Sequence, residues 1–198
     1  MKFADLYHYA NTQLDGDAVP LKELQTRIQA FHGSVGKVEF WPVELDRTKS
    51  LGHIKYERDR SSPYDDAFTV VSIRYDKTLT RCWRRFVCCK ELMHVFDTNP
   101  EKVDTRDKFF RLMKELETPP LFGDQSPMYA SELRAQWMAV FCLVPERLRN
   151  KYKMHLNSGS IDEYSVALKL KIPLAYVKAI SSEYYDIALQ RLLSDPDI

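Results

Sequence analysis

Neither sign of charge dominates the sequence, which carries 29 Lys and Arg against 28 Asp and Glu in 198 residues. This near balance does not support a general polyanion-binding role, so any basic patch must be local. Long apolar runs are also missing: the longest, WMAVFCLVP, covers nine residues, whereas a helix needs about 20 to cross a bilayer. The amino terminus, MKFADLYHYANTQLDGDAV, has acidic and polar residues where a secretory signal is continuously apolar.

Paired cysteine motifs are absent as well. The four cysteines are Cys82, Cys88, Cys89 and Cys142, and none forms a C-x-x-C pair. We interpret them as reduced thiols that act as small apolar packing residues. Together with the missing signal and membrane span, this predicts a cytoplasmic protein with no membrane partner.

Hydrophobic periodicity predicts helices, then a few short strands, then helices again. This order is typical of an α+β fold rather than of alternating βαβ units. The expected helices are 2–13, 20–32, 79–96, 105–117 and 128–143, followed by helical segments in 145–156, 160–172 and 173–193. The expected strands are 37–45, 52–59 and 68–75, with a turn at 61–66 and a loop at 118–127. Pro42 restricts the first strand to an edge or a bulge.

The stretch RFVCCKELMHVF (85–96) differs by one letter from a zinc-protease helix. Such a helix reads H-E-x-x-H, with two imidazoles one turn apart and a glutamate that takes a proton from metal-bound water. Here Glu91 and His94 are present, but Lys90 stands at the first ligand position. A protonated amine has no lone pair for a metal. Because a buried ammonium needs a counter-charge, we expect Lys90 to replace the ion and to pair with Glu91, Asp97 or a carboxylate of helix 128–143.

The neighbouring motifs follow a definite order: RRFVCCKELMH, then SELRAQWMAVFCLVP, then VALKLKIPLAYVKAIS. This order resembles the ImmA/IrrE metallopeptidase family, whose pattern reads R-x-x-R-F-T-x-x-H-E-x-x-H, then E-x-E-A-N-x-F-A-x-x-L-L-x-P, then L-A-x-x-F-x-V-S-x-x-A-V. The resemblance covers residues 15–190 and is stronger in order and spacing than in identity. A glycine-bearing strand near Gly52 and the strand 68–75 precede the helix in the same order.

The resemblance implies a role for each matching residue. Glu91 matches the general base, former or residual, and His94 the second histidine ligand. Glu132 matches the first acidic position of the third-ligand helix, while Arg134 replaces the second. Glu132 shares a helical face with small alanines, which leave room for its carboxylate to reach the site. At most two of three usual ligands remain, and catalytic zinc sites use three protein ligands plus water.

As an architecture, the resemblance implies a degenerate zincin-like domain over 1–145, with a small sheet packed by helices around the altered helix. A helical C-terminal extension, 146–198, packs on it. The implied function is that of a metal-free pseudo-peptidase that binds a protein partner, a regulator or its extended peptide segment, in regulation linked to mobile elements or phage–host conflict. The sequence favours this non-catalytic protein over an enzyme.

An active metal-dependent peptidase that cleaves a regulatory protein is the alternative. It would use Glu91 as base and hold zinc through His94, Glu132 and either Asp97 or His155.

Strand 68–75, FTVVSIRY, is the best strand candidate because it is rich in β-branched and aromatic residues. If it lies at a sheet edge beside the altered helix, it can capture an extended peptide through Val70, Ser72 and Arg74. The alternative is an internal strand that is already paired on both sides.

Residues 160–185 resemble a helix-turn-helix, with Pro173 at the turn. The second helix, PLAYVKAISSEY, would offer Lys178 but little else to base edges. DNA binding is therefore a further alternative, and the sequence does not favour a nucleic-acid partner.

Overall fold

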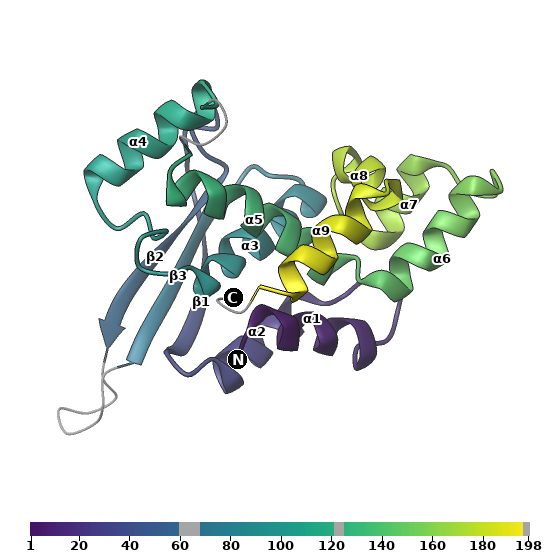
Figure 1. Ribbon diagram of the computed structural model, residues 1–198, viewed down its shortest axis with the longest axis horizontal. Coiled ribbons are helices and arrows are strands. Elements are labelled where there is room, and N and C mark those ends of the chain that lie inside the picture. Colours follow the sequence, from purple (N-terminus) through teal and green to yellow (C-terminus); the bar gives the residue numbers. More distant parts are fainter. Residues whose placement is uncertain (60–67, 121–124, 196–198) are drawn as a thin grey trace.

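The computed structural model describes residues 1–59, 68–120 and 125–195. The fold is α+β, as expected: helices pack on a small three-stranded mixed sheet (Figure 1). The turn expected at 61–66 and the middle of the loop expected at 118–127 lie outside the described residues.

The sheet consists of β1 (Val35–Val43), β2 (Gly52–Asp59) and β3 (Phe68–Asp76) in the order β1-β3-β2. β1 pairs with β3 in parallel, and β2 pairs with β3 antiparallel. Pro42 therefore lies on an edge strand, where its missing N–H interrupts no internal ladder, as its position predicts.

The peptide-binding role expected for β3 is wrong, because β3 is the central strand. Ser72 stands opposite Glu39 of β1 and Lys55 of β2, and Val70 and Arg74 are paired on both sides in the same way. Their main-chain groups are already used, so no extended peptide can add to this strand.

One face of the sheet packs on helices. Val71 and Ile73 of β3 belong to the same buried core as Leu92 of the central helix. That core also includes α1 (Phe3–Thr12) and α2 (Leu21–Phe31). Since strand side chains alternate between faces, Val70, Ser72 and Arg74 point away from this helix.

The central helix is α3 (Arg81–Met93), followed by the 3-10 turn η1 (His94–Phe96). α3 packs against α5 (Pro127–Leu143), whose alanines at the contact are buried. α5 begins where the sequence indicates: Ser126 caps it by accepting a bond from the Tyr129 N–H, and Pro127 occupies the first turn. α4 (Arg106–Glu117) lies at one end of α5 and packs on it, with Leu112 buried against Met128 and Tyr129 (Figure 1).

The carboxyl-terminal part contains α6 (Glu146–Asn157), α7 (Glu163–Leu170), the 3-10 turn η2 (Leu174–Tyr176), α8 (Val177–Ser181) and α9 (Tyr184–Leu193). α9 packs on α5, with the Tyr185 ring edge-on to Phe141. One hydrophobic core runs through both parts of the chain. No helix among the described residues combines the length and the apolar character that a bilayer span requires.

The segment PLAYVKAISSEY is not the single recognition helix expected for DNA binding. α8 ends at Ser181, because Ser182 adopts an extended conformation (φ −77°, ψ 158°). Val177 and Ile180 of this short helix are buried in the core. What remains exposed is too short to read a groove as a recognition helix does.

Candidate functional site

The last turn of α3 brings Lys90, Glu91 and His94 together, as the helical period requires. The Lys90 Nζ lies 2.5 Å from Glu132 Oε2 of α5 and 3.0 Å from Glu91 Oε1. The ammonium expected to pair with a carboxylate of helix 128–143 does so. Burial alone would lower the pKa of Lys90, but Glu91 and Glu132 together raise it well above its usual value. Lys90 is therefore a charged group bridging two carboxylates.

His94 is held on both sides of its ring. Its Nδ1 lies 2.8 Å from Asp97 Oδ2 and 3.2 Å from Ser131 Oγ. Its Nε2 lies 3.4 Å from Glu132 Oε1, where the two charges attract, but among the described residues this buried nitrogen has no partner with hydrogen-bond geometry. Burial opposes the charge on the ring, but Asp97 and Glu132 outweigh it and raise the pKa of His94 to about 10. The imidazolium form therefore prevails at neutral pH.

Beyond His94, the cluster continues with charged side chains of alternating sign. Arg134 donates to Asp97 Oδ1 at 3.2 Å and to Glu101 Oε1 at 2.7 Å. Burial raises the pKa of Glu101, but bonds from Arg134 and Thr98 lower it to about 2. Arg134 thus extends the cluster. We call the series Glu91, Lys90, Glu132, His94, Asp97, Arg134 and Glu101 the charge chain.

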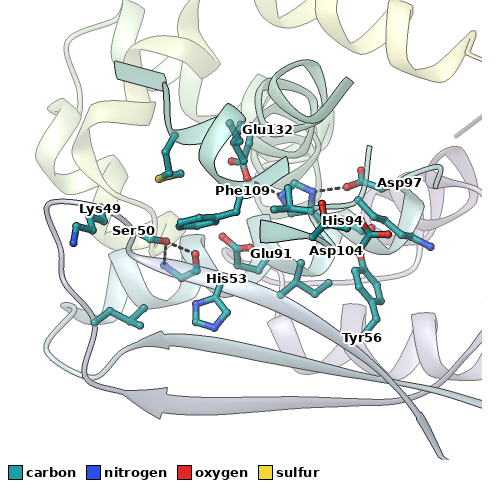
Figure 2. Close-up of a pocket in the computed structure, with 18 of the residues that line it drawn as sticks. Lys49, Ser50, His53, Tyr56, Glu91, His94, Asp97, Asp104, Phe109 and Glu132 are labelled. Atoms are coloured by element: carbon teal, nitrogen blue, oxygen red, sulfur yellow. Dashed lines mark hydrogen bonds and ion pairs between the residues drawn. The ribbon is translucent and has the colours of Figure 1, made fainter. Parts of the chain in front are cut away.

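A cavity of about 490 Å³ lies against the charge chain, within the range of small-ligand and peptide pockets. One wall is β2 with the loop before it, and the other is the 102–105 segment with the apolar face of α4. Figure 2 shows Phe109, Glu91, Glu132 and His94 in the middle of this cavity, with Lys49, Ser50 and His53 toward one end and Asp97, Asp104 and Tyr56 toward the other. We call it the first cavity.

A second cavity of about 260 Å³ adjoins the first. Glu91 and Glu132 line both, whereas Lys90 lines only the second and His94 only the first. The two carboxylates therefore stand between the cavities. We call these two neighbouring cavities over the last turn of α3 the groove.

Gly52 allows β2 to approach α3 closely. A Cβ at this position would lie 2.5 Å from Val87 Cγ1 and 3.4 Å from Glu91 Cγ. Tyr56, four residues further along β2, donates its hydroxyl to the His94 carbonyl oxygen at 2.6 Å. These two contacts fix the edge strand beside the charge chain.

The residues present do not fit a catalytic zinc ion. His94 Nε2 is oriented as a ligand would be, with Nδ1 tied to a carboxylate in the manner of metal-bound imidazoles. However, the Lys90 ammonium already contacts Glu132, and a second cation there would be repelled. Among the described residues, no group of three or more His, Cys, Asp or Glu side chains is arranged to hold a metal.

His155 is not brought to the site. It lies on α6, where its Nδ1 contacts Ser160 Oγ, and it lines neither cavity. The prediction that His155 could be a zinc ligand is wrong, because α6 packs with the carboxyl-terminal helices rather than against α3. The other residues predicted for the altered metal site do lie together: Lys90, Glu91, His94, Asp97 and Glu132.

Sequence reasoning missed the walls of the groove. Phe109, Leu112 and Met113 of α4 line the first cavity, and the loop carrying Arg47 and Lys49 lines the second. The sequence shows the apolar periodicity of α4, but periodicity does not determine which cavity the apolar face of this helix lines. No protein-family model, curated protein or solved structure matches this chain.

Proposed function

We propose that this protein binds an extended peptide segment of a protein partner in the groove over α3, and that it does so as a pseudo-peptidase without a metal. The single observation that carries the proposal is the Lys90 ammonium between Glu91 and Glu132. It supplies positive charge where a zincin-like helix would need a metal ligand, while the groove above it stays open. The regulatory context, mobile elements or phage–host conflict, rests on the resemblance to the ImmA/IrrE family.

The groove supports a peptide as occupant for two reasons. β2 lines it and is an edge strand of the described sheet, so its outer main-chain groups can pair with an added strand. The opposite wall is apolar and includes Phe109, which is 41% exposed. Main-chain pairing supplies affinity, and the apolar wall receives a side chain.

The metal-binding half of the proposal is tested by calorimetric zinc titration of the wild type, Lys90→His and Lys90→Gln. Lys90→His replaces the cation with a third ligand and should bind zinc at least 100-fold more tightly than the wild type. Lys90→Gln removes the charge without adding a ligand and serves as the matched control. Stoichiometric, tight zinc in the wild type would overturn the proposal, and equal weak binding by all three would refute a latent metal site.

The peptide-binding half is tested with two adjacent phenylalanines. Phe109 lines the first cavity, whereas Phe110 lies under Arg106 and lines neither cavity. Phe109→Ser should abolish capture of partner peptides, and Phe110→Ser should not. Equal effects of the two substitutions would argue against the groove as the binding surface.

An active peptidase is the second candidate, and one observation favours it: the buried His94 Nε2 without a hydrogen-bond partner. The zinc titration separates the two candidates, because this one requires a metal in the wild-type protein.

A further inference from the structure

The two cavities of the groove differ in charge. The first is lined by five carboxylates, against two lysines and the His94 imidazolium. The second is lined by three cations, Arg47, Lys49 and Lys90, against the two carboxylates Glu91 and Glu132. A ligand that spans both cavities therefore meets a different balance of charged groups in each.

The unneutralised charge of the second cavity lies at Arg47 and Lys49. Lys90 is already shared between Glu91 and Glu132. Lys49 pairs with Asp46 at 3.3 Å, but both side chains are mostly exposed, so this pair is weak. Within the described part of the chain, no ion pair of Arg47 is found.

The loop that carries Arg47 and Lys49 is anchored at both ends. At its start, the Leu45 N–H donates to Asp76 Oδ2 at 3.1 Å. At its end, Ser50 Oγ donates to the Gly52 carbonyl oxygen at 2.5 Å. Asp46 closes the turn between them by accepting from the Thr48 N–H at 3.1 Å. The backbone that carries the two cations is therefore ordered before any ligand arrives, which reduces the ordering cost of binding.

The inner wall of the second cavity is aromatic. Phe86 stacks on Tyr176 with centroids 3.9 Å apart, and Trp83 meets both rings edge-on. Gln136 fixes the Tyr176 hydroxyl by donating to it at 2.6 Å. Such a wall receives the methylene stem of a side chain, while the cations at the rim receive its charged end.

We infer that the second cavity is a subsite for a carboxylate, carried by an Asp or Glu of the same extended segment whose apolar residue fills the first cavity. This inference rests on the proposed function and names the chemistry of its partner: an acidic residue and an apolar residue a few positions apart. A cationic side chain is disfavoured there, because the nearby carboxylates are already neutralised and the available charges are positive.

Selection of displayed random octapeptides on the immobilised full chain tests this inference. Selected peptides should be enriched in Asp or Glu near an apolar residue. Their affinity, measured by fluorescence anisotropy, should fall at least tenfold for Arg47→Glu/Lys49→Glu and should weaken with added salt. Lys153→Glu/Arg191→Glu, the same charge change on α6 and α9, is the matched control and should leave the affinity unchanged.

The outcomes distinguish this inference from the proposed function. Peptides that lose binding with Phe109→Ser, yet show no acidic preference and no response to Arg47→Glu/Lys49→Glu, would overturn the acidic subsite and leave the groove intact. Enrichment of Lys or Arg would overturn it as well. If no selected peptide depends on Phe109, the peptide-binding function itself fails.

Discussion

Two ion clusters in this molecule differ in how far their acidic partners are buried and in what surrounds them. In the carboxyl-terminal part, Arg149 donates to both oxygens of Asp186 at 2.8 Å, to the Ile180 and Ser182 carbonyl oxygens, and lies over the Tyr185 ring. Its Asp186 partner is half exposed.

The charge chain, by contrast, has a buried His94 Nε2 without a hydrogen bond and faces a groove. Buried polar atoms are almost always satisfied, and exceptions concentrate where a ligand or a reaction once needed them. The comparison indicates that the arginine cluster stabilises packing between helices, whereas the charge chain also faces a cavity, as the proposed binding site requires.

The largest effect on stability is expected when the charge of Lys90 is removed. Lys90→Met leaves two buried carboxylates with no ammonium between them, which should cost about 3–5 kcal/mol of unfolding free energy. Combining it with Glu132→Gln should recover part of this loss, because the uncompensated charge is removed. Urea denaturation measures both. A cost below about 1 kcal/mol for Lys90→Met would mean that the ion pair is not formed.

The arginine cluster should respond differently to loss of its acid. Asp186→Asn should cost under about 1 kcal/mol, because Asp186 is half exposed and Arg149 keeps its two carbonyl partners. Glu132→Gln should cost more, roughly 2–4 kcal/mol, since it leaves both Lys90 and His94 short of a counter-charge. The same denaturation series compares the two. Equal losses of unfolding free energy for Asp186→Asn and Glu132→Gln would show that the two clusters do not differ in this way.

The pH dependence of stability should report the His94 charge. Asp97 and Glu132 raise the pKa of His94 to about 10 against burial, from about 6.5 in the unfolded chain. A raised folded-state pKa contributes stability that is complete below pH about 6.5 and is lost as the pH rises through about 10.

As the pH rises between these two values, the free energy of unfolding of the wild type should fall by roughly 1–3 kcal/mol, and that of His94→Gln should not. Denaturation at pH 6, 8 and 10 measures the difference. Parallel curves for the two proteins would show that the ring is neutral in the folded state.

Periodicity alone predicted much of this arrangement. Lys90 and His94 share a face of α3 because they are one turn apart, and Glu132 was assigned inward because alanines flank it on its face of α5. The position of β3 could not be predicted in this way. Its β-branched residues are equally typical of a central strand and of an edge strand. The central position of β3 depends instead on its parallel pairing with β1 and its antiparallel pairing with β2, which its own residues do not encode.

The groove walls depend on how α4 and the 44–51 loop dock, which no local pattern encodes. PLAYVKAISSEY failed as a single helix for a related reason: Val177 and Ile180 are drawn into the core, and the chain turns at Ser182 to start α9. In both places tertiary contacts override the local signal.

A small effect is also expected at Ser131, which links the two halves of the charge chain. Its hydroxyl donates to Asp97 Oδ1 at 2.7 Å and lies 3.2 Å from His94 Nδ1. Ser131→Ala removes one neutral donor from a carboxylate that keeps His94 and Arg134, so it should cost about 1 kcal/mol.

Because Asp97 then has one donor fewer, it should attract the imidazolium more strongly, and the pKa of His94 should rise further. Histidine titration by NMR in the wild type and in Ser131→Ala measures this shift. A fall in that pKa would mean that Ser131, rather than Asp97, is the main partner of the ring, and the part of the charge chain that begins at Glu91 would then end at His94.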